Sequence, residues 1–371
     1  MTKKINLGVI FGGRSGEHEV SLMSAQSVLS VLDKDKYKVT PIGIDKNGIW
    51  WAGNNVLASL KNNDTSDLIR VFLLPEPGNN ILYKRIQSGP QETIVPFAEL
   101  DVVFPVLHGT FGEDGTLQGF FEMADIAYVG AGVLGSSVGM DKGIFKDVMR
   151  SHNIPVVDWI TFTRKDIEEN INQVMKQCEK IAEYPLFVKP ANLGSSVGIS
   201  KVKNHSDLLE GLMEASRYDR RILVEKGLDA REIEVSVIGN ESCRASIAGE
   251  IIPADEFYSY DAKYINDNSE LCIPADIPQK VAEEIHEIAL NVYKAIDCAG
   301  LTRVDFLLEK GTDQIFLNEV NTIPGFTSIS MYPKLWGKSG LPYPELIDEL
   351  IALAFERKEE RNKSKRTFGE D

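Results

Sequence analysis

Cysteine and histidine are scarce in this sequence, and neither is arranged for disulfide or metal chemistry. The chain of 371 residues contains four cysteines and five histidines, with no CxxC pair and no HExxH motif. We therefore expect reduced structural thiols, as in a cytoplasmic protein, and no zinc centre. No apolar run is long enough to span a bilayer. The short run near the N-terminus leads into glycines, which predicts a buried first strand rather than a signal peptide.

The sequence also lacks an excess of positive charge, since its formal net charge is -15 at pH 7. Nucleic acids and anionic membranes require a basic surface, so neither is expected as a partner. Two nucleotide-binding motifs are absent as well. The first glycine-rich turn does not have the GxGxxG spacing of dinucleotide sites, and no GKS or GKT follows a glycine-rich loop. A small nucleotide site stays compatible with this composition, because it needs only a few lysines and Mg²⁺.

Apolar segments and helical periodicity predict an α/β fold, with α+β character in the C-terminal part. Residues 5–11 and 102–107 are buried-strand patterns separated by helical ones, as in a parallel sheet covered by helices. Residues 61–91 are polar and are expected to form an insertion or a long loop. From residue 232 onward, polar and apolar residues alternate as in a half-buried antiparallel sheet. The charged tail from residue 357 is expected to fray into solvent.

The sharpest chemical pattern is a predicted hairpin, in which TRVDFLLEK and QIFLNEVN flank a glycine-containing turn. Strand side chains alternate between faces, so Arg303 shares a face with Asp305, and Glu319 shares one with Asn321. Antiparallel pairing about the turn would bring both pairs level. The resulting two carboxylates and one amide are hard oxygen ligands that suit Mg²⁺ bound to phosphate. The alternative is a solvated strand face with a single salt bridge.

A loop of small residues is a candidate phosphate site. The segment KPANLGSSVGISKV begins with Lys189 at the end of a strand. Its backbone amides, together with the hydroxyls of Ser195 and Ser196, could surround phosphate oxygens. Lys142 lies beside small residues and could neutralise phosphate charge. The alternatives are a flexible β-turn and two surface lysines.

Further polar segments follow predicted strands, where open α/β sheets bind ligands. LVEKGL could offer backbone edges and Glu225 to an adenine, with Glu232 nearby for ribose hydroxyls. GGRSGEHEVS places Glu17 and Glu19 at a helix start, where either charge could hold a substrate ammonium. HGTFGEDG carries His108, which at such a position is either a substrate contact or a structural hydrogen bonder.

Seven motifs in order give the chain a resemblance to the D-alanine–D-alanine ligases of the ATP-grasp superfamily. They are GGxSxEHEVS, LHGxxGEDGxxQG, GMDK, KPANLGSSVGISKV, EFYSYDAKY, TRVDFLL and NEVNTIPGFTSISMYP, and the resemblance covers residues 5–353. It implies a three-domain ATP-grasp fold that begins with an open parallel sheet. The N-terminal α/β substrate-binding domain would cover residues 1–131 and the central ATP-grasp domain residues 132–225. The C-terminal ATP-grasp domain would cover residues 226–371, with a mobile lid loop at about 256–268.

The resemblance also implies roles for individual residues. ATP would be bound by Lys142, Lys189, Ser196, Glu225, Lys226, Leu228, Glu232 and Lys263. Two Mg²⁺ ions, with Mn²⁺ as a possible substitute, would be bound by Asp305, Glu319 and Asn321. Glu19 would take the ammonium of the first D-alanine and connect through Ser195 to Tyr264 of the lid. Arg303 and the backbone N–H of Gly325 would stabilise an oxyanion. His108, Ser330 and Met331 would contact the substrates.

The implied reaction is the ATP-dependent joining of two D-alanine molecules through an acyl phosphate, for peptidoglycan precursor synthesis. Related ligases use D-serine or D-lactate as the second substrate, and the D-lactate branch commonly replaces the lid tyrosine by histidine. Tyr264 therefore favours an amine as the second substrate, and the apolar Met331 suits a methyl side chain. A non-catalytic nucleotide-binding protein is the alternative from another class. The resemblance further implies a homodimer formed through the N-terminal domain.

Overall fold

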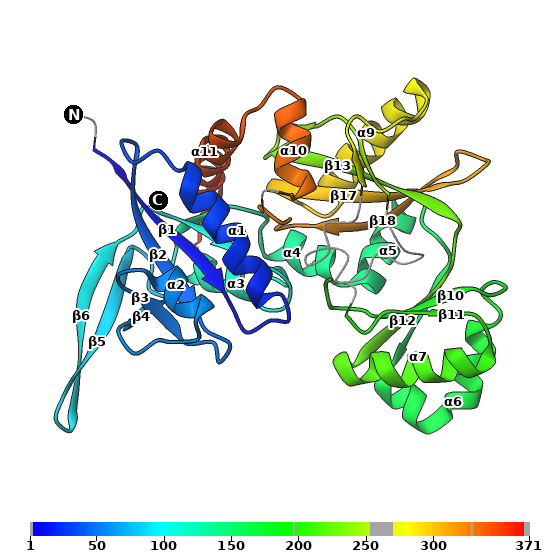
Figure 1. Ribbon diagram of the computed structural model, residues 1–371, viewed down its shortest axis with the longest axis horizontal. Coiled ribbons are helices and arrows are strands. Elements are labelled where there is room, and N and C mark those ends of the chain that lie inside the picture. Colours follow the sequence, from blue (N-terminus) through cyan, green and yellow to red (C-terminus); the bar gives the residue numbers. More distant parts are fainter. Residues whose placement is uncertain (1–2, 196, 253–269, 328, 367–371) are drawn as a thin grey trace.

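The structure is a computed structural model that describes residues 3–195, 197–252, 270–327 and 329–366. Three β-sheets with flanking helices follow one another along the chain (Figure 1). In these described residues, no helix is both long and apolar enough to cross a bilayer. The sheets lie within residues 5–128, 159–226 and 230–321. The domain boundaries expected from the sequence remain predictions.

The first sheet combines a parallel centre with an antiparallel extension. Its strand order is β6-β5-β4-β3-β2-β1-β7-β8, in which β1 pairs parallel with β2 and β7. Residues 61–91, expected to be a loop or insertion, contain two of the antiparallel strands, so a structureless loop is wrong. Val71 and Leu82 are buried there, while polar residues such as Arg70 and Lys84 stand between the apolar ones, which hid the strands from a search for apolar runs. The strands are β1 (Ile5–Gly12), β2 (Tyr37–Ile44), β3 (Trp50–Ala52), β4 (Ile69–Leu73), β5 (Ile81–Ser88), β6 (Gln91–Glu99), β7 (Val102–Val106) and β8 (Ala127–Tyr128).

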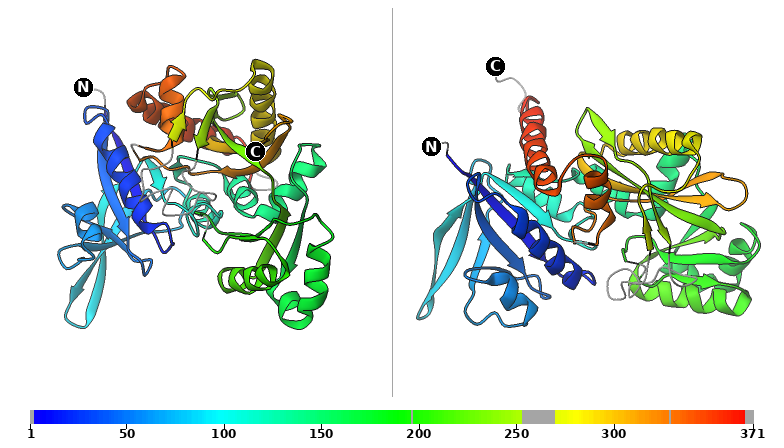
Figure 2. Two further views of the ribbon diagram at one scale, coloured as in Figure 1. Left: turned by 45° about the vertical axis from the view of Figure 1, so that its right-hand side comes forward. Right: turned by 45° about the horizontal axis from the view of Figure 1, so that its top comes forward.

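Helices from both ends of the chain cover this sheet. The nearby helices are α1 (His18–Val31), α2 (Val56–Lys61) and α3 (Thr116–Met123). The last helix, α11 (Tyr343–Asn362), buries Leu346 and Leu350 in the same hydrophobic core as Val9 and Phe104 of the first sheet. Figure 2 shows α11 standing between the first sheet and α10 (Met331–Lys338). The C-terminal helix therefore ties the last sheet to the first.

The charged tail does not begin to fray at residue 357, contrary to expectation. Residues up to Asn362 are helical, and three basic side chains bind the end of α3. The Arg361 guanidinium pairs with Glu122 and lies 2.5 Å from Asp125, and Lys358 donates to the Asp125 carbonyl. Arg357 stacks on Tyr128, with its guanidinium carbon 3.9 Å from the ring centroid. Acidic partners distant in sequence keep this helix ordered.

The second sheet is antiparallel and holds its helices on one face. Its order is β11-β10-β12-β9. Val188 and Val224 point into a core under α6 (Arg164–Cys178) and α7 (His205–Tyr218). Because strand side chains alternate, Lys189 and Glu225 lie on the opposite face, where Lys146 of α5 (Lys142–Ser151) packs against Glu225. The strands are β9 (Trp159–Thr163), β10 (Leu186–Pro190), β11 (Ser200–Val202) and β12 (Arg221–Lys226).

The third sheet is also antiparallel, as the sequence pattern predicted. Its order is β16-β15-β13-β17-β18, and β14 pairs with β13. Helix α9 (Gln279–Ala295) covers one face, and α4 (Val133–Met140) and α5 (Lys142–Ser151) lie between this sheet and the others. The strands are β13 (Ala230–Gly239), β14 (Cys243–Ala245), β15 (Gly249–Ile252), β16 (Glu270–Cys272), β17 (Gly300–Glu309) and β18 (Ile315–Asn321).

Candidate active site

The hairpin of β17 and β18 has the register that the sequence predicted. Arg303 lies opposite Asn321, and Asp305 lies opposite Glu319. The Arg303 guanidinium donates to both Asp305 oxygens at 2.7 Å, and the Asn321 side-chain amide donates to Asp305 at 2.9 Å. Asp305 is only 9% exposed, and the alternate residues, such as Val304, are buried in the core. A solvated face with a single salt bridge is therefore excluded.

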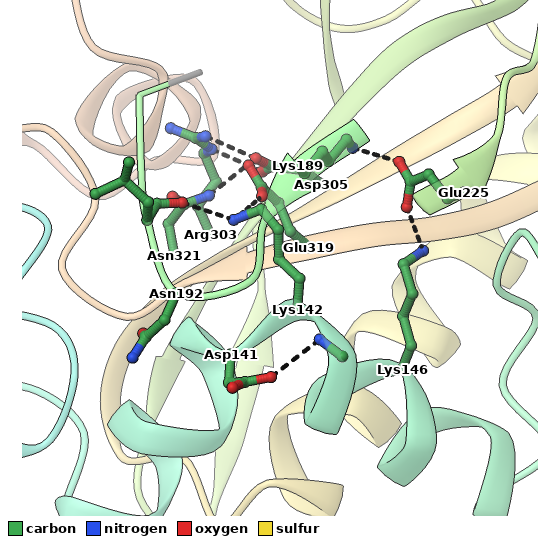
Figure 3. A network of polar contacts seen from close by, with 12 residues as sticks. Asp141, Lys142, Lys146, Lys189, Asn192, Glu225, Arg303, Asp305, Glu319 and Asn321 are labelled. Carbon is green, nitrogen blue, oxygen red and sulfur yellow. Dashed lines mark hydrogen bonds and ion pairs between the residues drawn. The ribbon is translucent and has the colours of Figure 1, made fainter. Parts of the chain in front are cut away.

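Helix α5 brings a lysine to this hairpin face. Its first residue is fixed by Asp141, whose carboxylate accepts hydrogen bonds from the backbone N–H groups of the first turn and an ion pair from Arg221 at 2.6 Å. The Lys142 ammonium then lies 3.2 Å from Glu319 and donates to the Leu193 carbonyl at 3.0 Å (Figure 3). The Asp141 cap of α5 therefore orients the Lys142 ammonium towards the predicted metal ligands.

A second charged cluster lies beside the first, on the face of the second sheet opposite α6 and α7. Glu225 accepts ion pairs from two lysines, Lys189 of β10 and Lys146 of α5, and all three side chains are largely buried. Burial opposes ionisation of Glu225, but the two lysines outweigh it and hold its pKa well below the ordinary value. Burial likewise opposes charging of Lys189, but Glu225 raises its pKa. The sequence had indicated Lys189 and Glu225 separately and had missed Lys146.

The glycine and serine loop connects β10 to β11 and folds back towards the first sheet. The Lys142 backbone N–H donates to the Ala191 carbonyl at 2.9 Å, which attaches the loop to α5. Ser195 takes a left-handed backbone conformation, with φ of 51°, and its hydroxyl donates to Glu17. Ser196, predicted to contact phosphate, lies outside the described residues. Between β10 and β11 the loop thus runs past the lysines and contacts Glu17 at the start of α1.

Glu17, rather than Glu19, is the acidic residue at this junction. The Glu17 residue is 7% exposed, whereas the Glu19 side chain is 55% exposed and pairs with Lys46 at 2.7 Å. An added Cβ at Gly109 would lie 2.2 Å from the Glu17 carboxylate, and one at Gly194 would lie 2.7 Å from it. The glycines of two distant loops therefore make room for this carboxylate. The expected link between Glu19 and Ser195 is absent, and Glu17 makes the contact instead.

His108 is held by protein groups on both ring nitrogens. Its Nε2 lies 2.9 Å from the Ser24 hydroxyl, and its Nδ1 lies 2.9 Å from the Ile323 carbonyl. Burial lowers the His108 pKa to about 4, so the ring is neutral near pH 7. These contacts agree with the structural hydrogen bonder that the sequence left open. The ring joins the first sheet to the chain just after β18.

Glu113 joins the same two parts of the chain and was not selected from the sequence. Its carboxylate accepts hydrogen bonds from the Gly109 N–H at 2.8 Å and from the Ile323 N–H at 3.0 Å. Burial, together with the nearby charge of Glu17, raises the Glu113 pKa to about 8. The only sequence signal was its place in HGTFGEDG, directly after the second glycine. Acidic residues in such loops usually cap a local turn.

The segment after β18 carries the predicted oxyanion and carboxylate contacts. The Ser330 hydroxyl accepts from the Thr327 N–H at 3.0 Å and lies beside Gly325, where an added Cβ would approach it to 2.8 Å. The Phe326 N–H donates to Ser24 at 3.2 Å. Met331 is buried in a small hydrophobic cluster with Ile251 and Leu335.

The remaining predicted residues fall in two places. Some lie where the second sheet connects to the third, and the others lie outside the described residues. Lys226 is exposed at the end of β12, and its N–H donates to the Asp158 carbonyl at 2.9 Å. Leu228 and Glu232 are half-buried between β12 and the start of β13. Lys263 and Tyr264 lie in the segment that is not described. In the described part of the chain, no cluster of three His, Cys, Asp or Glu side chains could hold a metal, and the hairpin offers two carboxylates and one amide.

The two antiparallel sheets, with buried lysines facing a carboxylate-bearing hairpin, define an ATP-grasp ligase fold. The D-ala D-ala ligase N-terminus family model matches residues 6–131, and the C-terminus model matches residues 148–352. The chain belongs to the D-alanine–D-alanine ligase family. It is 47% identical to the D-alanine–D-alanine ligase of Natranaerobius thermophilus over 99% of this chain and 100% of that protein. The corresponding enzyme of Heliobacterium modesticaldum is 49% identical over 97% of each chain.

Solved structures give the same family with the same fold. The D-alanine–D-alanine ligase of Coxiella burnetii aligns with a TM-score of 0.82 at 36% identity, over 98% of this chain and 97% of that one. The VanG D-Ala:D-Ser ligase of Enterococcus faecalis aligns with a TM-score of 0.83 at 35% identity, over 95% of this chain and 100% of that one. The fold is therefore shared by ligases with different second substrates.

Proposed function

We propose that this protein joins two D-alanine molecules to D-alanyl-D-alanine with ATP, through an acyl phosphate, as a step in making peptidoglycan precursors. The observation that carries the proposal is the register of the hairpin, which sets Asp305 level with Glu319 and opposite Lys142. Family membership and the full-length similarity to D-alanine–D-alanine ligases support the choice of reaction.

A carboxylate is a poor electrophile, so the first D-alanine must be activated before an amine can attack it. Its carboxylate attacks the γ-phosphoryl group of ATP, which forms the acyl phosphate and releases ADP. Phosphoryl transfer needs mainly positioning and charge stabilisation. Lys142 and Lys189 supply positive charge for the phosphates, and Glu225 with the segment from Lys226 to Glu232 receives the adenosine. The amine of the second D-alanine then attacks the acyl carbon, and phosphate leaves.

The hairpin donors fit Mg²⁺. Asp305, Glu319 and Asn321 present hard oxygens on one face, and Lys142 already neutralises Glu319 there. These residues would hold the two Mg²⁺ ions, whose chemistry is to neutralise phosphate charge during transfer. Arg303 keeps Asp305 in place through its paired hydrogen bonds and, with the Gly325 N–H, would stabilise the oxyanion.

We assign the ammonium of the first D-alanine to Glu17 in place of Glu19. Glu17 is buried against the Ser195 loop, where the phosphates would lie, whereas Glu19 points to solvent and pairs with Lys46. A low-exposure carboxylate holds an ammonium better than a solvated one, because water screens the pair less. The second D-alanine would place its carboxylate at Ser330.

A phosphate-release assay with the purified enzyme tests the proposal. Release should require ATP, Mg²⁺ and D-alanine together, and mass spectrometry should detect D-alanyl-D-alanine. Phosphate release that is unchanged when D-alanine is omitted would contradict it and favour another ATP-dependent role. Parallel reactions with D-serine and D-lactate decide the second substrate, since a dominant D-alanyl-D-serine product would select the D-serine alternative. The homodimer, the cytoplasmic location and the closing lid remain predictions.

A further inference from the structure

Lys146 is a buried cation that lies in none of the seven sequence motifs and has no role in the proposed reaction. Its side chain is 1% exposed, and its ammonium lies 3.1 Å from the Glu225 carboxylate and 5.8 Å from the ring centroid of Trp159. Within the described residues, the ammonium has no well-aligned hydrogen-bond acceptor, so its contact with Glu225 is an ion pair. A lysine so deeply buried is rare unless a carboxylate compensates it.

The two oxygens of Glu225 serve different lysines. Oε1 faces Lys189, and Oε2 faces Lys146 (Figure 3). The lysines come from different elements, since Lys189 is the last residue but one of β10 and Lys146 lies one turn into α5. Glu225 itself is fixed in the middle of the sheet, opposite Phe187 of β10 and Trp159 of β9. The carboxylate is therefore rigid, and its two partners differ in their surroundings.

Lys189 can reach a ligand, and Lys146 cannot. The Lys189 side chain is 11% exposed, and the charges of Glu319 and Glu232 act on it as well as that of Glu225. Lys146 lies against Trp159 beneath the carboxylate, where Glu225 is its main charge partner and Glu319 a weaker one. If a nucleotide phosphate drew Lys189 away, Glu225 would lose one of its two cations. If Lys146 were absent, that movement would leave the buried Glu225 carboxylate with no counter-charge. Such a state is strongly unfavourable, so Glu225 would hold Lys189 in place.

We propose that Lys146 is a positioning residue, a permanent counter-ion of Glu225 that leaves Lys189 available to the phosphates of ATP. This rests on the proposed function, in which Glu225 and Lys189 bind the nucleotide. With Lys146 in place, Glu225 stays ionised and oriented when Lys189 turns to phosphate. Without it, Glu225 holds Lys189, and ATP must compete with a buried ion pair for the same ammonium.

The test compares Lys146→Met with wild-type enzyme in the full-length chain. We expect the calorimetric Kd and the KM for ATP to rise about tenfold or more, as for loss of one charged hydrogen bond. The kcat and the KM for D-alanine should change less than about threefold, since their groups are untouched. Lys146→Arg, which keeps the charge, should recover part of the ATP affinity. Lys176→Met, an exposed lysine of α6, is the matched control and should behave as wild type.

A double-mutant cycle separates this role from simple packing. In the Glu225→Gln background the carboxylate charge is gone, so adding Lys146→Met should change ATP affinity by less than about threefold. The double variant also removes both buried charges and remains informative if Lys146→Met alone does not fold. Equal effects of Lys146→Met in both backgrounds, or a lower Tm with unchanged ATP affinity, would overturn the proposal.

Wild-type measurements distinguish failure of this inference from failure of the proposed function. Wild-type enzyme that binds ATP but shows no D-alanine-dependent phosphate release would refute the proposed reaction, while the binding comparison would still decide the role of Lys146. Wild-type enzyme that is active, together with a Lys146→Met variant of unchanged ATP affinity, would refute only the role of Lys146. Wild-type enzyme that binds no ATP would refute both.

Discussion

Two regions of the molecule gather polar side chains in opposite ways. In the hairpin, Asp305 and Asn321 are 16 residues apart and are joined by neighbouring strands. At the junction between the first sheet and the rest, Glu17 and Ser195 are 178 residues apart, and His108 and Ile323 are 215 apart. The hairpin patch follows from local strand pairing. The junction forms where the first sheet meets the loop after β10 and the segment after β18.

The difference explains why the sequence predicted a contact between Ser195 and Glu19, whereas the structure shows Ser195 bound to Glu17. Strand alternation sorts residues within the hairpin, so its four polar side chains could be grouped from their spacing. No such rule separates Glu17, the N-cap residue of α1, from Glu19 in the first turn of that helix. Only the approach of Gly109 and Gly194 to Glu17 decides which of the two is buried.

The strongest test of the hairpin is Asp305→Asn. This change removes one of the two carboxylates that face the nucleotide, and losing such charge stabilisation costs roughly 10²–10³ in kcat. D-alanine-dependent phosphate release measures the effect, with circular dichroism to confirm folding. Asp313→Asn at the exposed hairpin turn is the matched control and should retain full activity. A loss below about tenfold would mean that the patch is structural.

At the junction, the His108→Gln variant is expected to change the pH dependence of stability. The folded pKa of His108 is about 4, below the ordinary 6.5, so the unfolded chain binds the proton more readily. Its contribution to stability is therefore complete above pH 6.5 and is lost as pH falls towards 4, by about 3 kcal/mol. Urea unfolding of the variant between pH 7 and pH 4 should show a shallower decline than wild type. An unchanged decline, or one equally altered by His152→Gln at the exposed end of α5, would refute this.

Glu17→Gln and Glu19→Gln test the assignment at the junction directly. Removing the buried charge of Glu17 should raise the KM for D-alanine roughly 10- to 100-fold, the usual cost of losing a charge-assisted contact. Glu19→Gln removes only an exposed ion pair with Lys46 and should change that KM less than about twofold. Initial rates at varied D-alanine and saturating ATP give both values. The opposite ranking would restore Glu19 as the ammonium ligand.

The smallest expected effect concerns the far end of the junction, where α11 meets α3. Arg361→Ala removes a partly buried guanidinium that pairs with Glu122 and Asp125, and it should lower stability by about 1 kcal/mol and Tm by roughly 1–2 °C. Lys363→Ala, an exposed lysine at the end of the same helix, should leave Tm unchanged. Thermal melts at low and high salt measure both. An Arg361→Ala effect no larger than that of Lys363→Ala would show that apolar packing alone holds α11.

Much of the fold could be predicted because the buried face of a strand or helix requires apolar residues at a regular spacing along the sequence. The apolar run at residues 5–11 became β1, and the alternating residues of the hairpin became β17 and β18 in the expected register. β4 and β5 were missed because polar residues interrupt their apolar ones and their pairing partners lie across a turn. The ordered end of α11 was missed because its charges resemble those of a solvated tail, while their acidic partners lie more than two hundred residues earlier.

By itself, the sequence determined the antiparallel hairpin, its two carboxylates and the glycine-rich loop, since strand period and turn chemistry act between near neighbours. The tertiary structure alone decided that Glu17 is buried, that both nitrogens of His108 are occupied and that Lys146 lies beneath Glu225. Those outcomes depend on which distant surfaces meet. Desolvation and ion pairing change sharply over a few ångströms, and spacing along the chain does not specify distances of that size.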